Sequence, residues 1–188
     1  MEEEANFCIE VATEKMEKAI QHLEDELMRI RAGKASPNIL DGISIDYYGA
    51  VTPLSQVSNI GTPDAKTVVI QPWDKSMLEP IERAILYANI GLTPMNNGEL
   101  IRLNIPRLTE ERRRDLVRVV ARRVEEARVA IRNLRRDALQ DLKEFEKEKM
   151  ISEDDFYHGK DKVQELTDEF IETIDEMGSR KEVEVMEV

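Results

Sequence analysis

Apolar residues recur at steps of three and four along the N-terminal part of the chain. The repeating positions are Met16, Ile20, Leu23, Leu27 and Ile30. Because an α-helix turns once in 3.6 residues, this spacing predicts an amphipathic helix over about residues 6–31. Gly33 is expected to end that helix, and Pro37 would prevent its resumption.

A second, longer apolar stripe follows residue 109. Its members are Val117, Val120, Val124, Ala127, Ile131, Leu134, Ala138, Leu142 and Phe145. Thr109 is placed to cap this helix, and Glu110 and Glu111 suit the positive end of its dipole. The pattern predicts a helix that reaches Lys149, about 60 Å long at 1.5 Å per residue.

A third stripe begins after Ser152, which has Asp155 three residues later in the arrangement of a capping box. The expected buried positions are Phe156, Val163, Leu166, Phe170, Ile174 and Met177. None of the three helices can bury its apolar stripe alone. We therefore expect them to form one antiparallel three-helix bundle.

The middle of the chain has a different pattern. "GISIDYY" and "ELIRLNI" alternate between apolar and polar residues as strands do, and "TVVIQPW" is a short apolar run. "PIERAILYANIG" indicates a short helix with Pro80 in its first turn and Gly91 at its end. Asn97-Gly98 is a turn signal before the last strand. These elements predict a small β/α/β lobe.

Composition separates the same two parts. All seven prolines lie between Pro37 and Pro106, and residues 34–106 hold 12 charged side chains whereas the other 115 positions hold 54. The expected fold class is α+β, with a discontinuous bundle (1–32 and 107–188) interrupted by a lobe (33–106). Two connecting segments, near 33–36 and 104–107, are expected to act as hinges. The expected hinge residues are Gly33, Lys34, Pro37, Ile105 and Pro106.

Little in the sequence suggests catalysis. Cys8 is the single cysteine, so no intramolecular disulfide can form, and His22 and His158 lack the spacing of metal ligands. "RAGKASP" has neither the earlier glycine nor the Ser or Thr after the lysine that a phosphate-binding loop requires. The N-terminus does not resemble a secretion signal, and no run approaches the roughly 20 apolar residues of a membrane span. We expect a soluble cytoplasmic protein that is not an enzyme and holds no cofactor or metal.

Positive charge is concentrated in one place. Residues 109–136 carry ten arginines and five acidic residues, a net charge of +5, in a chain whose formal net charge is −12, so the remainder carries −17. On an ideal helix, seven of these arginines project into a sector about 140° wide. They are Arg114, Arg118, Arg122, Arg128, Arg132, Arg135 and Arg136.

Three interpretations of this sector remain open on physical grounds. It could contact nucleic acid, bind a protein with an acidic face, or be a solvated surface with ion pairs such as that of Arg122 or Arg118 with Glu125. Nucleic acid is favoured because every base in this stretch is arginine, the better fork for phosphate. A protein scaffold is the alternative, and its complexes would survive ribonuclease and depend less steeply on salt.

The chain also resembles a known family, the ribosome recycling factors. The resemblance rests on "IRAGKASPNILDGISIDYYG", "LTEERRRDL", "ARVAIRNLRRDA" and "ISEDD", in the order and spacing of that family. It implies a three-helix rod with an inserted β/α/β lobe on a two-stranded hinge, an elongated L shape similar to transfer RNA. Lys34 stands where the family usually has arginine.

The resemblance implies a function as well. Such a factor, with elongation factor G and GTP, splits the ribosomal subunits after translation termination and frees messenger and transfer RNA. It implies that a monomer binds rRNA of the large subunit, away from any membrane. The implied rRNA-binding residues are Arg128, Arg132, Arg135 and Arg136, with Arg112, Arg113 and Arg31.

Overall fold

The computed structural model of the chain describes residues 2–30 and 32–187. These residues form two compact units. One comprises the described residues up to Ala32 together with those from Thr109 onward, and the other is Gly33–Leu108. The first unit is helical and the second is a small sheet with one α-helix. The predicted α+β class, a helical bundle with a small β/α lobe, is confirmed.

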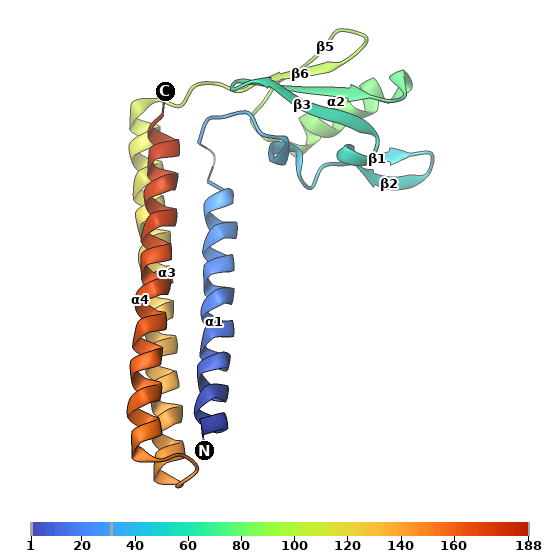
Figure 1. Cartoon of the computed structure of the whole chain (residues 1–188). Coiled ribbons are helices and arrows are strands. Elements are labelled where there is room, and N and C mark those ends of the chain that lie inside the picture. The colour runs from blue at the N-terminus through green and yellow to red at the C-terminus, as the bar shows by residue number, and fades with distance from the viewer. Residues whose placement is uncertain (1, 31, 188) are drawn as a thin grey trace. The chain divides into compact units, whose positions relative to one another are not determined.

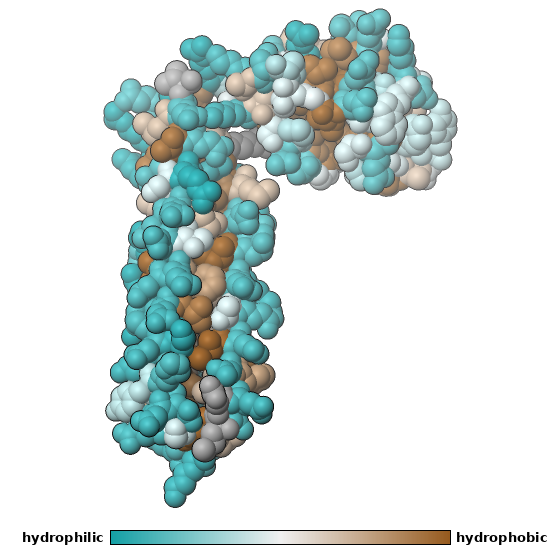
Figure 2. Space-filling view, viewed as in Figure 1, coloured by the Kyte–Doolittle hydropathy of each residue, from teal (hydrophilic) through white to brown (hydrophobic). Residues whose placement is uncertain are grey.

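Three long helices make up the first unit: α1 (Glu2–Met28), α3 (Glu110–Lys147) and α4 (Glu153–Met186). Each packs against the other two, and Figure 1 shows that α1 and α4 run in one direction while α3 runs in the opposite one. Polar side chains cover most of the bundle, and apolar side chains appear along its length between the helices (Figure 2). This is the arrangement expected of amphipathic helices that bury their stripes against each other.

The starts of α3 and α4 are set by the predicted caps. Thr109 Oγ1 accepts a hydrogen bond of 3.1 Å from the backbone N–H of Arg112. At α4, Ser152 Oγ accepts from the backbone N–H of Asp155, and the Asp155 carboxylate accepts from the backbone N–H of Ser152, both at 3.1 Å. Each cap satisfies N–H groups that a helix start leaves without partners. Both sequence predictions are confirmed.

The ends of α1 differ from the prediction. The helix begins at Glu2 rather than near residue 6, and its last residue is Met28, so Gly33 does not terminate it directly. The first turns of the helix bury only small side chains, those of Ala5, Cys8 and Ala12, and of these Ala5 lies before the predicted start. Small side chains carry a weak apolar signal, which is why the periodicity of larger residues begins only at Met16.

The buried stripe of α4 is also different in detail. Val163 and Ile174 are fully buried as predicted, but Phe156, Leu166, Phe170 and Met177 are only half-buried. The remaining buried positions are held by small or polar residues and one valine: Gly159, Thr167, Gly178 and Val185. α4 therefore approaches its neighbours through small residues, with the larger apolar side chains beside the seam.

The second unit contains more strands than the sequence pattern predicts. Its strands are β1 (Ser44–Tyr47), β2 (Ala50–Pro53), β3 (Ser58–Asp64), β4 (Thr67–Pro72), β5 (Pro94–Asn96) and β6 (Ile101–Asn104). β1 and β2 form an antiparallel hairpin, and the other four form an antiparallel sheet in the order β3-β4-β6-β5. β2, β3 and β5 were not predicted, because their residues are largely exposed and lack a clear alternation.

Helix α2 (Leu78–Ala88) packs its buried residues Ile81 and Ile85 into the core of this unit. Pro80 lies in its first turn as predicted, but the helix ends at Asn89, with φ +50°, and not at Gly91. The predicted turn at Asn97-Gly98 connects β5 and β6, and the Asn97 N–H donates to Leu100 O at 3.2 Å.

The two connecting segments are attached to the same turn of the second unit. The Ala35 N–H donates to Ala65 O at 2.8 Å, and the Ile105 N–H donates to Lys66 O at 2.7 Å. Both side chains also pack against the apolar core of that unit. Residues 35 and 105 are therefore part of the β/α lobe itself.

Candidate nucleic-acid interface

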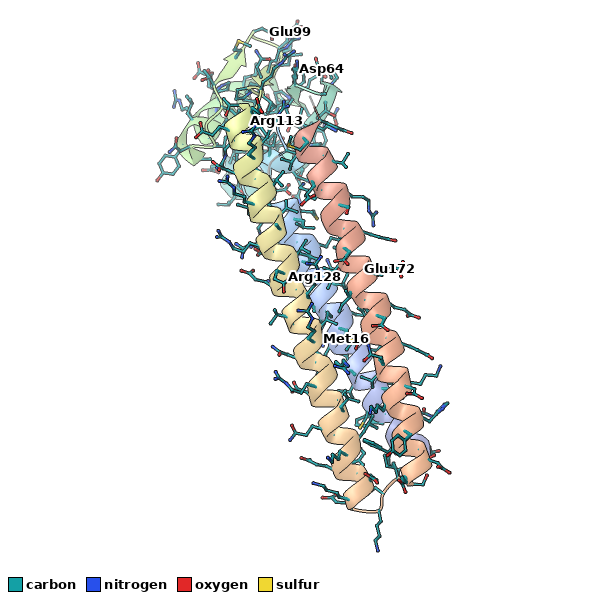
Figure 3. The ribbon with its side chains drawn as sticks, turned by 90° about the vertical axis from the view of Figure 1, so that its left-hand side faces the viewer. Met16, Asp64, Glu99, Arg113, Arg128 and Glu172 are labelled. Carbon is teal, nitrogen blue, oxygen red and sulfur yellow. The ribbon has the colours of Figure 1, made fainter. Side chains whose placement is uncertain are left out.

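Helix α3 carries the arginine-rich stretch on one continuous helix. Figure 3 labels Arg113 and Arg128 on α3, Glu172 on α4, and Met16 of α1 between the helices. Five arginines of the predicted sector are exposed: Arg114, Arg118, Arg122, Arg132 and Arg136. Arg128 and Arg135, at the edge of the sector, are half-buried. The helix thus presents most of the predicted face to solvent.

Arg132, Arg136 and Arg112 have guanidinium groups that can reach a ligand with little rearrangement. Arg132 Nη1 makes one long hydrogen bond of 3.4 Å to Glu125 Oε1, and more than half of the Arg132 side chain is exposed. Arg136 Nη2 donates to Asn133 Oδ1 at 2.6 Å. All three side chains lie on the surface, so a phosphate could replace or join their present partners.

Arg128 is held by an intramolecular ion pair that the sequence analysis missed. Its Nε and Nη2 donate to Asp175 Oδ1 of α4 at 2.8 and 2.6 Å, and its Nη1 donates to Glu125 Oε2 at 3.1 Å. Asp175 lies 47 residues further along the chain. No local spacing rule can reveal such a pair, because it depends on the register of α3 against α4.

Arg113 and Arg135 share another feature. Both are half-buried, and the Nε of each is buried without a hydrogen-bond partner among the described residues. Part of each side chain therefore lies against the bundle, as long basic side chains commonly do.

Glu125 does not pair as the sequence analysis suggested. Its partners are Arg128 and Arg132, whereas Arg118 pairs with Asp115 at 3.3 Å and Arg122 has no ion-pair partner among the described residues. Hydrogen bonding to Arg128, and then the charge of Arg132, lower the pKa of the Glu125 carboxyl. Glu125 is therefore an anion at neutral pH.

The remaining predicted residues have varied surroundings. Arg31 lies outside the described residues. Gly33 has φ +73°, Lys34 is exposed, and Pro37 begins a short 3₁₀ turn (Pro37–Leu40) that Ser36 caps. Ile105 is half-buried and hydrogen-bonded to Lys66, and Pro106 is exposed.

The described residues offer neither a cluster of metal ligands nor a membrane-spanning helix. His22 and His158 are both exposed. Over residues 2–30 and 32–187, no group of three or more His, Cys, Asp or Glu side chains is arranged to hold a metal ion. Within the same residues, no helix combines the length and the apolar character that crossing a bilayer requires.

The sequence matches known proteins over almost its whole length. The family model described as ribosome recycling factor matches residues 23–186. A ribosome-recycling factor of Flavobacterium johnsoniae is 52% identical over 188 residues, which is 100% of both chains. That of Natranaerobius thermophilus is 51% identical over 174 residues, 93% of this chain and 95% of the relative.

Solved structures agree with the sequence match. A solution structure of the ribosome recycling factor aligns with a TM-score of 0.78 at 37% identity, over 98% of each chain. A second has a TM-score of 0.63 at 42% identity, over 97% of this chain and 99% of the other. It represents models for the T. thermophilus ribosome recycling factor and the E. coli elongation factor G bound to the E. coli post-termination complex. With its helical bundle, its small β/α lobe and these end-to-end matches, the chain belongs to the ribosome recycling factor family.

Proposed function

We propose that this protein recycles ribosomes. After termination it binds the large subunit and, with elongation factor G and GTP, splits the subunits and releases messenger and transfer RNA. It acts as a cytoplasmic monomer and performs no chemistry of its own, because the hydrolysis of GTP belongs to the partner. The observation that carries the proposal is the 52% identity to a ribosome-recycling factor over the full length of both chains.

We propose that the bundle binds rRNA through α3. The exposed Arg132, Arg136 and Arg112 are the primary phosphate contacts. Arg132 has a long hydrogen bond to Glu125, and Arg136 is bonded to the neutral amide of Asn133, which a phosphate can replace or join.

Arg113 and Arg135 contribute through their outer nitrogens, and Arg31 is a further contact. Arg128, the seventh residue implied by the family resemblance, is paired with Asp175 and Glu125 and supports the face from within the bundle. Arginine suits contact with phosphate because its planar fork matches two phosphate oxygens.

The charge of the remaining chain supports selective binding over general attraction to RNA. Outside residues 109–136 the chain carries −17, so most of its surface repels phosphate. The protein therefore attracts an RNA surface that contacts α3 and avoids the acidic remainder of the chain. A protein partner with an acidic face is the alternative occupant of the same surface.

The splitting step is mechanical in this proposal. Elongation factor G pushes on the β/α lobe, and the connecting segments transmit or absorb the motion. Because Ala35 and Ile105 are hydrogen-bonded to Ala65 and Lys66, the lobe moves together with these two residues. The hinge motion is then confined to Gly33 and Lys34 on one segment and to the chain from Pro106 onward on the other.

The first experiment is co-sedimentation with purified large ribosomal subunits at two salt concentrations. Arg132→Glu/Arg136→Glu reverses two exposed charges on α3. Lys160→Glu/Arg180→Glu reverses two exposed charges on α4 and is the matched control. We expect the α3 variant to lose binding and the control to keep it, with a wild-type affinity that falls steeply with salt, by a logarithmic slope of about 0.7–0.9 per phosphate contacted.

Three results would contradict the proposal. The α3 variant could bind like the wild type while circular dichroism shows that its helices are intact. Binding could persist after ribonuclease digestion of the rRNA, which would favour the protein partner. Finally, wild-type protein that binds subunits but fails to split 70S ribosomes with elongation factor G and GTP, followed by light scattering, would contradict the recycling step.

A further inference from the structure

One acidic residue lies within the basic face of α3. On a helix that advances 100° per residue, Glu125 projects about 20° from Arg118, inside the sector of the seven arginines. Its neighbour Glu126 projects about 80° to the opposite side, outside that sector. Glu126 pairs with Arg123 at 3.0 Å, and Arg123 in turn pairs with Glu26 of α1 at 3.2 Å. The two adjacent glutamates thus belong to different surfaces.

Glu125 holds two arginines of the set implied by the family resemblance, Arg128 and Arg132, and the proposed function uses Arg132 as a phosphate contact. It accepts from Arg128 Nη1 at 3.1 Å and from Arg132 Nη1 at 3.4 Å. The rest of the Arg128 fork is bound to Asp175, so Arg128 is enclosed by two carboxylates. Among the residues that the structure describes, Arg132 has only the longer bond to Glu125. Arg128 is therefore fixed, whereas Arg132 can exchange its partner.

A carboxylate in this position acts on any phosphate that approaches the face. It lies within a Debye length, about 8 Å at physiological ionic strength, of a phosphate bound to Arg132. It repels that phosphate and competes with it for the guanidinium. A ligand must offset both effects through contacts elsewhere, and the exposed Arg118, Arg122 and Arg136 are the groups that supply them.

We propose that Glu125 is a specificity-determining residue of this RNA-binding face. By neutralising Arg128 and competing for Arg132, it weakens binding to an arbitrary RNA strand. A folded RNA surface that matches several exposed arginines at once displaces Glu125 from Arg132 and keeps its affinity. Specificity then arises because the wrong partner is penalised more than the right one. This inference rests on the proposed binding of rRNA by α3.

The test compares Glu125→Gln with Glu126→Gln. Each substitution removes one negative charge from an exposed glutamate on the same turn, so the two variants have the same net charge. Binding to a fluorescent 20-nucleotide oligouridylate and to purified large ribosomal subunits is measured over a range of salt concentrations. Oligouridylate is the arbitrary strand and the subunit is the matched surface.

We expect Glu125→Gln to bind oligouridylate about threefold to fivefold more tightly, the range of a single exposed charge pair. Its logarithmic salt slope should steepen by about 0.7, because one more phosphate is contacted on a single strand. Affinity for the large subunit should change by less than about twofold. Glu126→Gln should match the wild type in both assays. The salt slope is a readout that a merely structural role of Glu125 would not move.

Several results would contradict the role of Glu125 without contradicting the proposed function. Equal gains in oligouridylate binding by both variants would reduce it to an effect of net charge. Equal gains of Glu125→Gln on both RNAs, or no gain at all, would show that Glu125 does not discriminate between them. Wild-type protein that binds oligouridylate but not the large subunit would instead overturn the proposed function, and this inference with it.

Discussion

Gly178 of α4 lies against Val124 of α3 so closely that a β-carbon on the glycine would be 2.7 Å from Val124 Cγ2. Gly178 is buried and lies inside α4, where glycine is less favourable than alanine by about 1 kcal/mol. The close approach explains why glycine is present. Asp175 lies one turn before Gly178 and Arg128 one turn after Val124, so the same contact brings the ion pair of α3 and α4 within reach.

Gly178→Ala should destabilise the bundle. The added methyl group forces Val124 or the helices to move, which costs about 1–3 kcal/mol, and the better helix propensity of alanine offsets about 1 kcal/mol of this. Urea unfolding followed by circular dichroism measures the difference. The exposed Ser179→Ala is the matched control and should change stability little. Val124→Ala should destabilise the Gly178→Ala protein less than it destabilises the wild type, because it removes the crowded methyl groups. A Gly178→Ala protein that is more stable than the wild type would contradict the close contact with Val124.

This seam also shows what the sequence could and could not predict. Large apolar residues at helical spacing indicated the three helices, because their burial gives each helix one apolar face. Gly159, Thr167 and Gly178 gave no such signal, since their place in the seam depends on how closely two helices approach. In the lobe, the exposed strand β3 was missed for a related reason: its residues do not alternate.

For the candidate interface, the sequence predicted which residues share a face but not their ion-pair partners. The angular positions of the arginines follow from the helix period, so the basic face of α3 could be found from the sequence. The partners of Arg128 and Glu125 could not, because Asp175 belongs to another helix. Which arginines are fixed and which can exchange partners is therefore visible only in the folded chain.

Gly33→Ala should be more harmful than the same change at Gly42. Both glycines have a positive φ, +73° and +81°, which costs an L-residue about 1–2 kcal/mol. At Gly33 the new β-carbon would also lie 3.0 Å from Leu108 Cγ, whereas nothing lies within 4 Å at Gly42. Urea unfolding should show an extra loss of about 1 kcal/mol for Gly33→Ala.

Leu108→Ala offers a check on this explanation. Combined with Gly33→Ala it should remove the extra loss and leave only the backbone penalty shared with Gly42→Ala. If the combination instead adds two independent losses, the contact with Leu108 is not the cause. If Gly33→Ala and Gly42→Ala are equally destabilising from the start, backbone conformation alone accounts for both.

The capping box of α4 should make stability depend on pH. Hydrogen bonding to the Ser152 side chain and then to its backbone N–H lowers the pKa of the Asp155 carboxyl. A lowered pKa in the folded state means that the stabilisation is present above the ordinary Asp pKa and is lost as pH falls through the lowered value. The advantage of the wild type over Asp155→Asn should thus shrink below about pH 4. Thermal unfolding of both proteins between about pH 3 and about pH 7 measures how this difference in stability changes with pH.

Two variants complete the test of the cap. Ser152→Ala should cost about 1 kcal/mol at neutral pH, since it removes the side-chain acceptor for the Asp155 N–H. Asp154→Asn removes the same charge from the same turn without touching the capping box, and it should change stability less than Asp155→Asn. A larger effect at Asp154 would indicate that helix-dipole charge dominates over the cap.

Cys8 should be poorly reactive in the folded protein. It lies in an apolar cluster with Leu142 and Val163, and burial, followed by the charge of Asp141, raises the pKa of its thiol. Because the thiolate is the nucleophile, alkylation by iodoacetamide at pH 8 should be at least about tenfold slower than in urea. Leu142→Ala should accelerate the reaction by opening the cluster. Native protein that reacts as fast as N-acetylcysteine would contradict the burial.

Substitution of Arg128 should mainly lower the stability of the bundle, whereas substitution of Arg132 should mainly weaken binding to the ribosomal subunit. Arg128→Ala removes a two-point contact to Asp175 from a side chain only 32% exposed, and we expect a loss of up to about 1 kcal/mol in the free energy of unfolding. Arg132→Ala removes only the 3.4 Å contact to Glu125 and should leave stability almost unchanged. Co-sedimentation with large subunits should show the opposite order, because Arg132 is the guanidinium that can exchange Glu125 for phosphate.

A double-mutant cycle distinguishes the specific ion pair of Arg128 and Asp175 from a general effect of lost charge. The effects of Arg128→Ala and Asp175→Ala on stability should be less than additive, because either change alone breaks the pair. The corresponding cycle of Arg132→Ala with Asp175→Ala should show a smaller coupling, since these two residues are connected only through Glu125 and Arg128 in the described part of the chain. If Arg128→Ala instead weakened subunit binding more than Arg132→Ala without any change in stability, Arg128 would be a direct RNA contact and the division between a fixed and an exchangeable arginine would be wrong.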